Sequence, residues 1–572
     1  MNRIVLFALF SPSILVILLL VPANHAAEDP KPEAAYPFVF TDTTEAAGLL
    51  PDVANVWGHG AAWADVDGDG WLDLYVATFH MPDSKPSRLF RNKKGKFELD
   101  PQKSVTVSAR GTGVLFADLN NTGHLDLYLG NMPDPKNKHT GCAMFKNDGK
   151  GNFTDISKDC GACPQDFGGR SATVLDYDGD GLLDILVGED PIPGYNGSKT
   201  KRTRLFHNKG NYQFEDVTDT VGIPKEAPGL GVAVADVNND GFPDIFICSG
   251  TYNAILLNDG KGHFKEMPGS RELFSYKGAG EAGGDNMVCG VCFCDVNRDG
   301  LLDVVLGQHY SMPWHENVPN KLFINRGIKD GIPQFEEVTE KAGLKPLGMK
   351  SPHVEIQDFD NDGWPDIYFS TVKFKDGKPY PVIFRHQGIV KDGIPQFRDD
   401  AWAVNDFPTP EDRALDSTKM FEKVKKEHKV IYTAPGPTGD YDNDGRLDIF
   451  LPNWWPDQHS MLLHNETKGG NWLRVQVEGA SRERERPEKA VNRMGIGSKV
   501  SIYTEGHLGE PGALLGCRDI ATGYGYASGQ PAYAHFGLGK AEKVDVEVNL
   551  PHGKGKLTHK SVTANQLVTI KQ

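Results

Sequence analysis

The stretch Asp65-Val-Asp67-Gly-Asp69-Gly70-Trp-Leu-Asp73 decides how this sequence is interpreted. It returns, with substitutions, at six further places, which start at Asp118, Asp176, Asp236, Asp295, Asp358 and Asp440. The interval between consecutive starts ranges from 53 residues (65 to 118) to 82 residues (358 to 440). Self-similarity at periods of this size predicts a repeat architecture.

Each acidic stretch is one part of a larger repeated unit. A run of small apolar residues precedes it, as at 231–235, and a β-rich run follows it, as at 74–78. A Leu-Phe-x-Asn element, a Gly-rich turn and a closing Phe-x-Asp/Glu-Val-Thr element complete the unit, as at 205–208 and 214–218. Four short β-runs in each of seven units predict an all-β fold, a seven-bladed β-propeller.

The two ends of the repeat array complement each other. The last unit lacks its closing element, whereas Phe40-Thr-Asp-Thr-Thr44 stands alone near the N-terminus. We expect this strand to complete the last blade, because a closed ring leaves no exposed sheet edge. The propeller is therefore predicted over residues 38–466. An insertion at 408–429 with apolar residues at helical spacing predicts a short surface helix.

The acidic stretches have the composition of calcium loops. Carboxylates at alternate positions of a tight loop can converge on Ca²⁺, which prefers six to eight oxygen ligands, and glycine at position six permits the turn. We predict a calcium site, seven at most, in each of the following sets: Asp65, Asp67, Asp69 and Asp73; Asp118, Asn120, Thr122 and Asp126; Asp176, Asp178, Asp180 and Asp184; Asp236, Asn238, Asp240 and Asp244; Asp295, Asn297, Asp299 and Asp303; Asp358, Asp360, Asp362 and Asp366; Asp440, Asp442, Asp444 and Asp448.

The seven predicted sites are not equal. Four of them carry four aspartates, whereas Asn120 and Thr122 replace two carboxylates in the second. We expect affinity to follow the carboxylate count, which makes the Asp118 site the weakest. Asp, Asn and Gly also form turns without metal, but seven such turns would not each need four oxygens. The expected role of calcium is structural, since nothing singles out one loop for chemistry.

The N-terminal residues 1–27 are predicted to be a signal peptide. Arg3 precedes a long apolar run that ends in small residues. The run is also long enough for an uncleaved membrane anchor, so that alternative stays open. Export predicts a secreted, extracellular protein, or a periplasmic or cell-surface one. The formal net charge is −16 and no long basic run occurs, which argues against a nucleic-acid partner.

Eight cysteines remain in the exported chain, and export makes disulfides conceivable. Cys292 and Cys294 occupy positions that other repeats fill with alanine, so we interpret them as small core residues. Zinc or redox motifs at 160–163 and 289–294 are the less favoured interpretation. The sequence assigns no cysteine pairing.

Residues 467–572 follow a different pattern. Alternating strands are expected at 472–477, 495–503, 544–548 and 566–570, which predicts a compact C-terminal β-domain. This domain resembles the ASPIC/UnbV domain through Gly-x-Gly-x-x-Val (495–500), His-Phe-Gly-Leu-Gly (535–539) and Asn-Gln-x-x-x-Ile (565–570). The repeats resemble the FG-GAP or VCBS repeats of integrin-α-type propellers. Together they resemble the cartilage acidic protein family and its bacterial relatives.

This resemblance implies an extracellular calcium-binding protein of adhesion or matrix type, with a glycan or protein ligand. The loops opposite the calcium hairpins are long and aromatic, so we predict a ligand face at Tyr310, Trp314, Trp454 and Trp455. These aromatic residues could instead fill the central channel or pack on the C-terminal domain. An extracellular hydrolase or lyase with an axial active site is the alternative function. No catalytic motif occurs that would identify catalytic residues.

Overall fold

A computed structural model describes residues 36–79, 84–133, 141–165, 167–189, 201–275, 287–309, 320–347, 349–376, 378–399, 409–415, 417–432, 436–454, 459–480, 490–523, 525–526 and 528–572. The predicted signal peptide lies outside these residues. Residues 36–572 form one compact unit. Among the described residues, no helix has the length and apolar character needed to cross a membrane.

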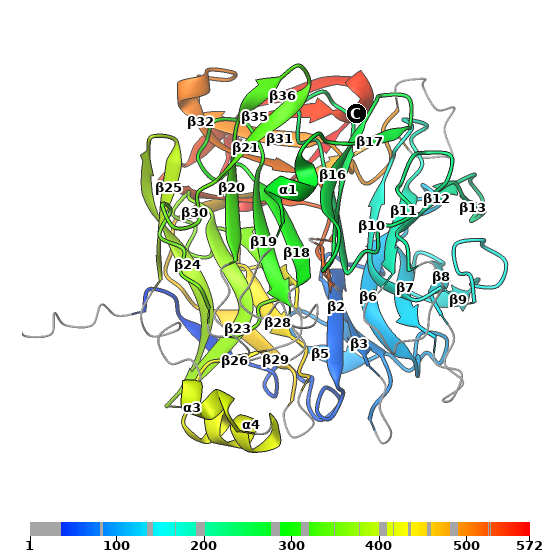
Figure 1. Ribbon diagram of the computed structural model, residues 1–572, viewed down its shortest axis with the longest axis vertical. Helices are drawn as coiled ribbons and strands as arrows, with labels where there is room; N and C mark the ends of the chain where they lie inside the picture. The colour runs from blue at the N-terminus through cyan, green and yellow to red at the C-terminus, as the bar shows by residue number, and fades with distance from the viewer. Residues whose placement is uncertain are drawn as a thin grey trace, which may run out of the picture. The chain divides into compact units, whose positions relative to one another are not determined.

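The first four repeats each contribute four antiparallel strands, in chain order, to a sheet (Figure 1). The first contains β2 (Gly58–Ala64), β3 (Asp73–Thr78), β4 (Arg88–Asn92) and β5 (Phe97–Leu99). The second contains β6 (Arg110–Ala117), β7 (Asp126–Met132), β8 (Ala143–Asn147) and β9 (Phe153–Asp155). The third contains β10 (Gly169–Leu175), β11 (Asp184–Glu189), β12 (Arg204–Asn208) and β13 (Phe214–Asp216). The fourth contains β14 (Gly231–Ala235), β15 (Asp244–Cys248), β16 (Asn253–Asn258) and β17 (Phe264–Glu266).

The remaining three repeats follow the same plan with additions. The fifth contains β18 (Met287–Cys294), β19 (Asp303–His309), β20 (Lys321–Lys329) and β21 (Ile332–Glu337). The sixth contains β22 (Val354–Gln357), β23 (Asp366–Lys375), β24 (Lys378–Lys391) and β25 (Ile394–Asp399), and β26 (Ile431–Tyr432) pairs with β23. The seventh contains β27 (Thr438–Gly439), β28 (Asp448–Leu451), β29 (Met461–Asn465) and β1 (Phe40–Asp42).

The N-terminal strand β1 pairs antiparallel with β29, and Phe40 lies opposite Asn465. The predicted all-β class is confirmed, with repeated four-stranded sheets typical of propeller blades. The count of seven blades and the closure of the ring stay predictions. Short helices lie outside the sheets: α1 (Ser270–Leu273), and α3 (Pro410–Arg413) and α4 (Ser417–Lys426) in the predicted insertion.

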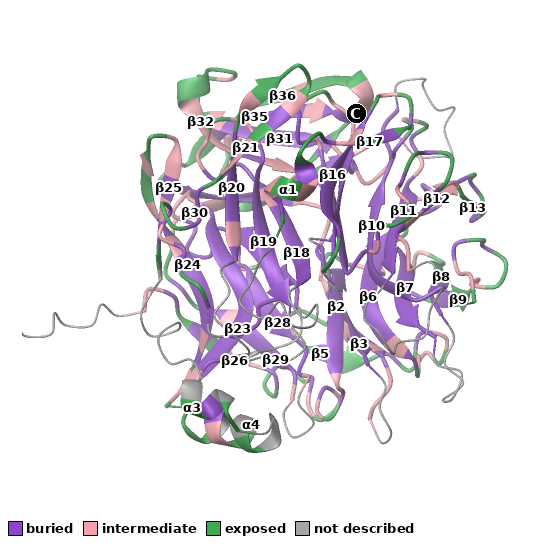
Figure 2. Ribbon diagram, viewed as in Figure 1, coloured by how far each residue is buried: buried purple, intermediate pink, exposed green. Residues whose placement is uncertain are grey.

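Strands one and two of the repeats are buried along most of their length, and the exposed positions lie in the third and fourth strands (Figure 2). Small residues fit the crowded inner strands, as in β2, where every residue is buried. Cys292 and Cys294 lie buried in β18, as predicted for small core residues. All eight cysteines are free thiols.

One asparagine in each repeat, replaced by His386 in the sixth, fastens consecutive sheets together. Asn147 of the second repeat donates its side-chain amide to the carbonyl oxygen of Val66 in the first, 2.8 Å away. The same bond recurs at each following step, from Asn208, Asn258, Asn325, His386 and Asn465. This buried contact explains why Asn ends the Leu-Phe-x-Asn element, since a buried amide needs partners.

The C-terminal segment adds two further sheets. One has the order β34 (Ala534–Gly539), β30 (Asn471–Glu478), β37 (Gln566–Lys571). The other has the order β32 (Leu514–Asp519), β31 (Lys499–Thr504), β35 (Lys543–Leu550), β36 (Gly555–Thr563), with short 3₁₀ turns at Pro511–Ala513 and Pro551–Gly553. The two-residue strand β33 (Ser528–Gly529) leaves this domain and pairs parallel with β2 of the first repeat.

Candidate metal loops and their C-terminal cover

The predicted loops join strands one and two of each repeat, and a common set of main-chain hydrogen bonds shapes all seven. The first aspartate receives N–H groups on both carboxylate oxygens, from Asp69 and Gly70 in the case of Asp65. The ninth receives two more, from Val66 and Asn92 in the case of Asp73. Both aspartates therefore fix the loop whether or not a metal is present.

Positions four and six of every loop have positive φ angles. Position six is always glycine, as expected, but position four is Gly68, Asn121, Gly179, Asn239, Arg298, Asn361 or Asn443. At five of these positions the side chain donates to the position-six carbonyl of the next loop, as Asn361 does to Gly445 at 3.0 Å. Only Gly68 and Gly179 lack a side chain for this bond. The repeat motif alone did not predict this ring of contacts.

The loops gather groups that could hold a metal ion. Ligand atoms lie within 4.8 Å of one another in sets that include Asp65, Asp67 and Asp73; Asp176, Asp178 and Asp184; and Asp358, Asp360 and Asp366. Burial raises the pKa of Asp73 to about 7 and the pKa values of Asp126, Asp184 and Asp448 to about 8. Such shifts measure the cost of holding carboxylates here without sufficient positive charge.

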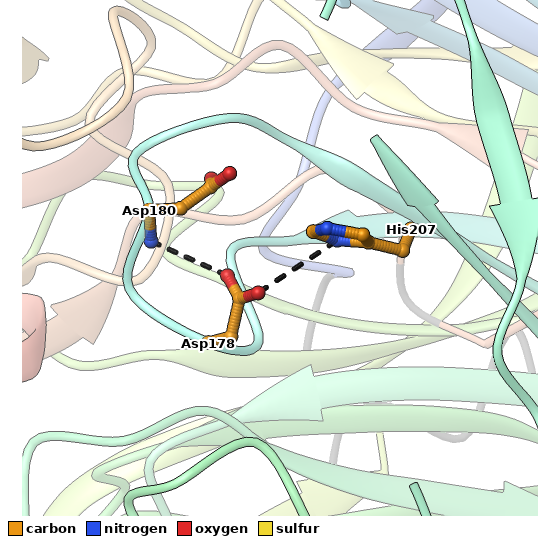
Figure 3. Close-up of side chains that lie close together, drawn as sticks. All are labelled: Asp178, Asp180 and His207. Atoms are coloured by element: carbon orange, nitrogen blue, oxygen red, sulfur yellow. Dashed lines mark hydrogen bonds and ion pairs between the residues drawn. The ribbon is translucent and has the colours of Figure 1, made fainter. Parts of the chain in front are cut away.

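Two loops are also contacted by a histidine from strand three of the same repeat, which the sequence-based prediction did not include. In the third loop, Asp178 lies between the main-chain N–H of Asp180, at 3.3 Å, and the ring of His207, at 3.7 Å (Figure 3). His207 also contacts Asp184 at 3.1 Å, and this hydrogen bond raises its pKa. His464 makes the matching contact with Asp448. Both occupy the position before the Asn that ends strand three, Asn208 or Asn465, and this shared place in the repeat is the one local signal that could have indicated them.

In the first and sixth repeats, an arginine occupies the position that a histidine holds in the third and seventh. Arg91 lies 3.4 Å from Asp67 and 3.3 Å from Asp73. Arg385 lies 2.7 Å from Asp360. In the fourth and fifth loops, Asn238 and Asn297 donate to the position-five carboxylates of Asp240 and Asp299. The ranking of the Asp118 loop as weakest stays a prediction.

Residues 65–129, 137–187, 195–247, 236–306 and 295–369 match the model of the FG-GAP-like repeat. The chain belongs to the FG-GAP-like repeat family. Residues 488–572 match the ASPIC and UnbV model. Both findings confirm the resemblance drawn from the motifs. Six of the seven candidate metal loops lie inside the matched FG-GAP-like repeats, and the loop at 440–448 lies beyond them.

Two relatives are similar to this chain in sequence. Cartilage acidic protein 1 of Homo sapiens is 25% identical over 580 residues, which cover 94% of this chain and 75% of that protein. Integrin alpha pat-2 of Caenorhabditis elegans is 25% identical over 353 residues, covering 58% of this chain and 27% of that protein. A solved Agrocybe aegerita lectin that recognises non-reducing terminal N-acetylglucosamine is 20% identical with a TM-score of 0.35, covering 65% of this chain and 84% of that one. A similarity this low carries no argument.

The C-terminal domain of this FG-GAP-like chain lies on the loop side of the repeats. Three of its cations meet the first aspartates of loops: Arg474 at 3.0 Å from Asp440, Lys554 at 3.5 Å from Asp176, and Lys499 at 3.9 Å from Asp236. His552 donates its main-chain N–H to the carbonyl of Gly241. This carbonyl receives no hydrogen bond from position four of the third loop, because Gly179 has no side chain. None of these contacts could be predicted from local sequence, because each joins segments far apart in the chain.

A second part of the C-terminal domain reaches between the inner strands of the FG-GAP-like repeats. Gly525 accepts the main-chain N–H of Val232, and the Tyr526 hydroxyl accepts a hydrogen bond from Arg170 at 2.5 Å. The Tyr526 ring is 1% exposed and lies 5.9 Å from the rings of both His59 and His309. The sequence analysis treated this segment as part of the C-terminal β-domain and missed its insertion.

Only one of the four predicted ligand-face residues is described. Trp454 is half-buried and packs edge-on against Trp57, His59 and Phe79, at 5.3 to 5.7 Å between ring centroids. Tyr310, Trp314 and Trp455 lie outside the described residues. Trp454 is thus close to His59 at the start of the inner strand β2, and Tyr526 contacts the same histidine.

Proposed function

We propose that this chain is an extracellular recognition module of adhesion or matrix type, stabilised by calcium and directed at a glycan or protein ligand. The FG-GAP-like repeats and the similarity to cartilage acidic protein and integrin alpha support this class. The names of these relatives denote no reaction. Export through a cleaved signal peptide at residues 1–27 is part of the proposal.

The observation that carries the calcium part is the shared geometry of the seven loops. Main-chain N–H groups hold the first and ninth aspartates in place, so the oxygen-bearing side chains at positions three and five are added to a prepared turn. Asp67 Oδ1 is buried and has no hydrogen-bond partner among the described residues. An all-oxygen set with an unsatisfied carboxylate oxygen fits a hard cation such as Ca²⁺.

Thermal unfolding with Ca²⁺ and with EGTA, together with a count of bound metal, tests this part. Calcium at 100 times its Kd should stabilise the folded state by about 2.7 kcal/mol for each independent site. Asp67→Asn should reduce the number of bound ions by one. Asp148→Asn, an exposed aspartate in a β8–β9 turn, is the matched control and should leave the count unchanged. An unfolding temperature that is the same with Ca²⁺ and with EGTA would overturn the proposal.

The ligand is proposed to bind on the face that carries Trp454. A partly buried tryptophan supported by Trp57 and Phe79 offers a rigid aromatic surface, and such residues often anchor interfaces. Glycan and protein arrays probed with the wild type should give a ligand that Trp454→Ala loses. Trp364→Ala, which changes a partly buried tryptophan in the sixth metal loop, is the control. Retained binding by Trp454→Ala would remove this face from the proposal.

The inserted segment around Tyr526 supports a binding function rather than an enzyme with its active site on the propeller axis. Propeller enzymes need catalytic groups that converge on an open axial pocket. Here Tyr526 contacts both His59 and His309, the buried histidines at the ends of inner strands. Loss of a hydrolytic activity on substitution of these histidines would favour the enzyme alternative.

A further inference from the structure

Two of the metal loops place an imidazole nitrogen beside two carboxylates in the same geometry. In the third loop, His207 Nδ1 lies 3.1 Å from Asp184 Oδ1 and 3.7 Å from Asp178 Oδ2, and Figure 3 shows the contact with Asp178. The corresponding distances from His464 Nδ1 in the seventh loop are 3.1 Å and 3.6 Å. The same arrangement therefore occurs twice, at equivalent places in two repeats.

These spacings are those of ligands around a small divalent ion. Zinc bonds to nitrogen and oxygen are about 2.0–2.2 Å long, so neighbouring ligand atoms in tetrahedral or octahedral shells lie about 2.8–3.6 Å apart. The distances of 3.1 Å match this range, and the longer ones lie at its upper edge. Asp180 can add a further oxygen in the third loop, because its ligand atom lies within 4.8 Å of those of Asp178 and His207.

The ligand groups can be reached from solvent. The side chains of His207 and Asp178 are 15% and 27% exposed, and those of His464 and Asp442 are 16% and 26% exposed. The position-nine aspartates below them are buried. Each set thus forms a shallow site with a fixed carboxylate at its base and two groups at its mouth.

The position that supplies the histidine faces the loop in other repeats too. The strand-three residue contacts the position-three aspartate in four repeats, through Arg91, His207, Arg385 and His464. In the fourth and fifth repeats position three is asparagine, and the strand-three residue is Leu257 or Ile324. Arginine has no lone pair to offer an ion, whereas imidazole does. Only the two histidines can change the ligand set of a loop.

The same two loops have one oxygen ligand fewer for calcium. Their first aspartates already meet cations of the C-terminal domain, Lys554 at 3.5 Å from Asp176 and Arg474 at 3.0 Å from Asp440. Both cations are 6% exposed, so these contacts are shielded from water. Calcium prefers six to eight oxygens, whereas zinc is satisfied by four ligands that include imidazole.

We propose that the third and seventh loops bind a divalent transition-metal ion of the zinc type in preference to calcium. The imidazole and the carboxylates at positions three and nine are the ligands. Imidazole suits zinc and similar ions, which calcium's preference for oxygen excludes from the other loops. The ion takes the place of the Nδ1 proton, which leaves to water. This inference rests on the metal-binding part of the proposed function and divides the loops into two classes.

The zinc content of the full chain tests the proposal. The protein is dialysed against micromolar Zn²⁺ in millimolar Ca²⁺, because the excess of calcium occupies loops that offer only oxygen. The wild type should retain two zinc ions, His207→Asn and His464→Asn one each, and the double variant none. Asparagine keeps an amide donor near the place of Nδ1. A second double variant, His207→Arg with His464→Arg, copies the first and sixth repeats and should also retain none.

His263→Asn is the matched control. His263 is 62% exposed and lies 3.7 Å from Asp259 in the β16–β17 turn, outside the metal loops, so this variant should retain two zinc ions. Zinc that stays in both double variants would be an adventitious ion only, held elsewhere, as by the neighbouring thiols of Cys160 and Cys163, and would overturn the proposal. A wild type that calcium stabilises but that binds no zinc would overturn this inference alone. A wild type that responds to neither ion would overturn the calcium part of the proposed function as well.

Discussion

The side-chain amide of Asn92 donates a hydrogen bond to the carbonyl oxygen of Tyr441 at 2.7 Å. Asn92 ends the third strand of the first repeat, and Tyr441 lies in the loop of the seventh. The same amide also bonds the carbonyl of Leu72 at 2.9 Å. All the other neighbouring repeats are fastened by this contact, and it thus also joins the last repeat to the first.

Replacing Asn92 tests whether the ring is closed in solution. Asn92→Ala should destabilise the protein by about 2–4 kcal/mol, because it leaves two buried carbonyls unbonded. Asn258→Ala is the matched variant, since Asn258 makes the same pair of bonds, to Tyr177 and Pro243, inside the array. Urea unfolding should give equal losses for the two. A much smaller loss for Asn92→Ala would mean that the first and last repeats do not stay joined.

The contacts of the C-terminal domain with the metal loops should contribute most to stability when calcium is absent. Lys554 and Asp176 are 6% and 1% exposed, so Lys554→Met leaves a buried carboxylate and should cost about 3 kcal/mol in EGTA. A bound cation would replace that lost charge, so the cost should shrink in calcium. Lys556→Met is the control, because Lys556 is 54% exposed and its pair with Glu547 should contribute under about 1 kcal/mol. Equal losses of stability with and without calcium would contradict the idea that Lys554 and a bound cation neutralise the same carboxylate.

The pair His459 and Asp42 should make stability depend on pH. The hydrogen bond to Asp42 raises the pKa of His459, so the contribution of His459 is complete below 6.5 and is lost as pH rises through the folded-state value. Burial opposes ionisation of Asp42, but hydrogen bonds from His459 and Thr44 outweigh it and lower its pKa below 3.8. The contribution of Asp42 is therefore lost only at still lower pH.

His459→Gln should consequently reduce stability more at pH 5.5 than at pH 8.5. The difference should stay below about 1 kcal/mol because the pair is partly exposed. Urea unfolding of both proteins at the two pH values measures it. A larger effect at pH 8.5 would show that the charged pair does not form.

The Tyr526 segment should hold the C-terminal domain on the repeats. Tyr526→Ala should cost about 3–5 kcal/mol, as expected for removing a buried aromatic ring. Tyr526→Phe keeps the ring but loses the hydrogen bond from Arg170, which should cost about 1.5–3 kcal/mol. Limited proteolysis should release the C-terminal domain more readily from Tyr526→Ala. Wild-type stability and resistance in that variant would mean that the inserted segment does not anchor the domain.

Much of the fold could be predicted because the signals are local and repeated. Period-two runs, the glycine at position six and the displaced segment at Phe40 each depend on a few neighbouring residues. Of the site, the positions of the loop aspartates could be predicted in the same way. His207 and His464 were missed because their strand pairing, rather than their spacing, brings them to the carboxylates.

The sequence by itself determined the repeat, its four strands and the oxygen-rich loops, since backbone geometry and alternation act over a few residues. Tertiary structure alone decided what surrounds those loops. Lys554 meets Asp176 and Tyr526 meets His59, although hundreds of residues separate the two members of each pair. Such contacts depend on how two folded parts pack, and the free energy of that packing is spread over both surfaces, so no short stretch of sequence records it.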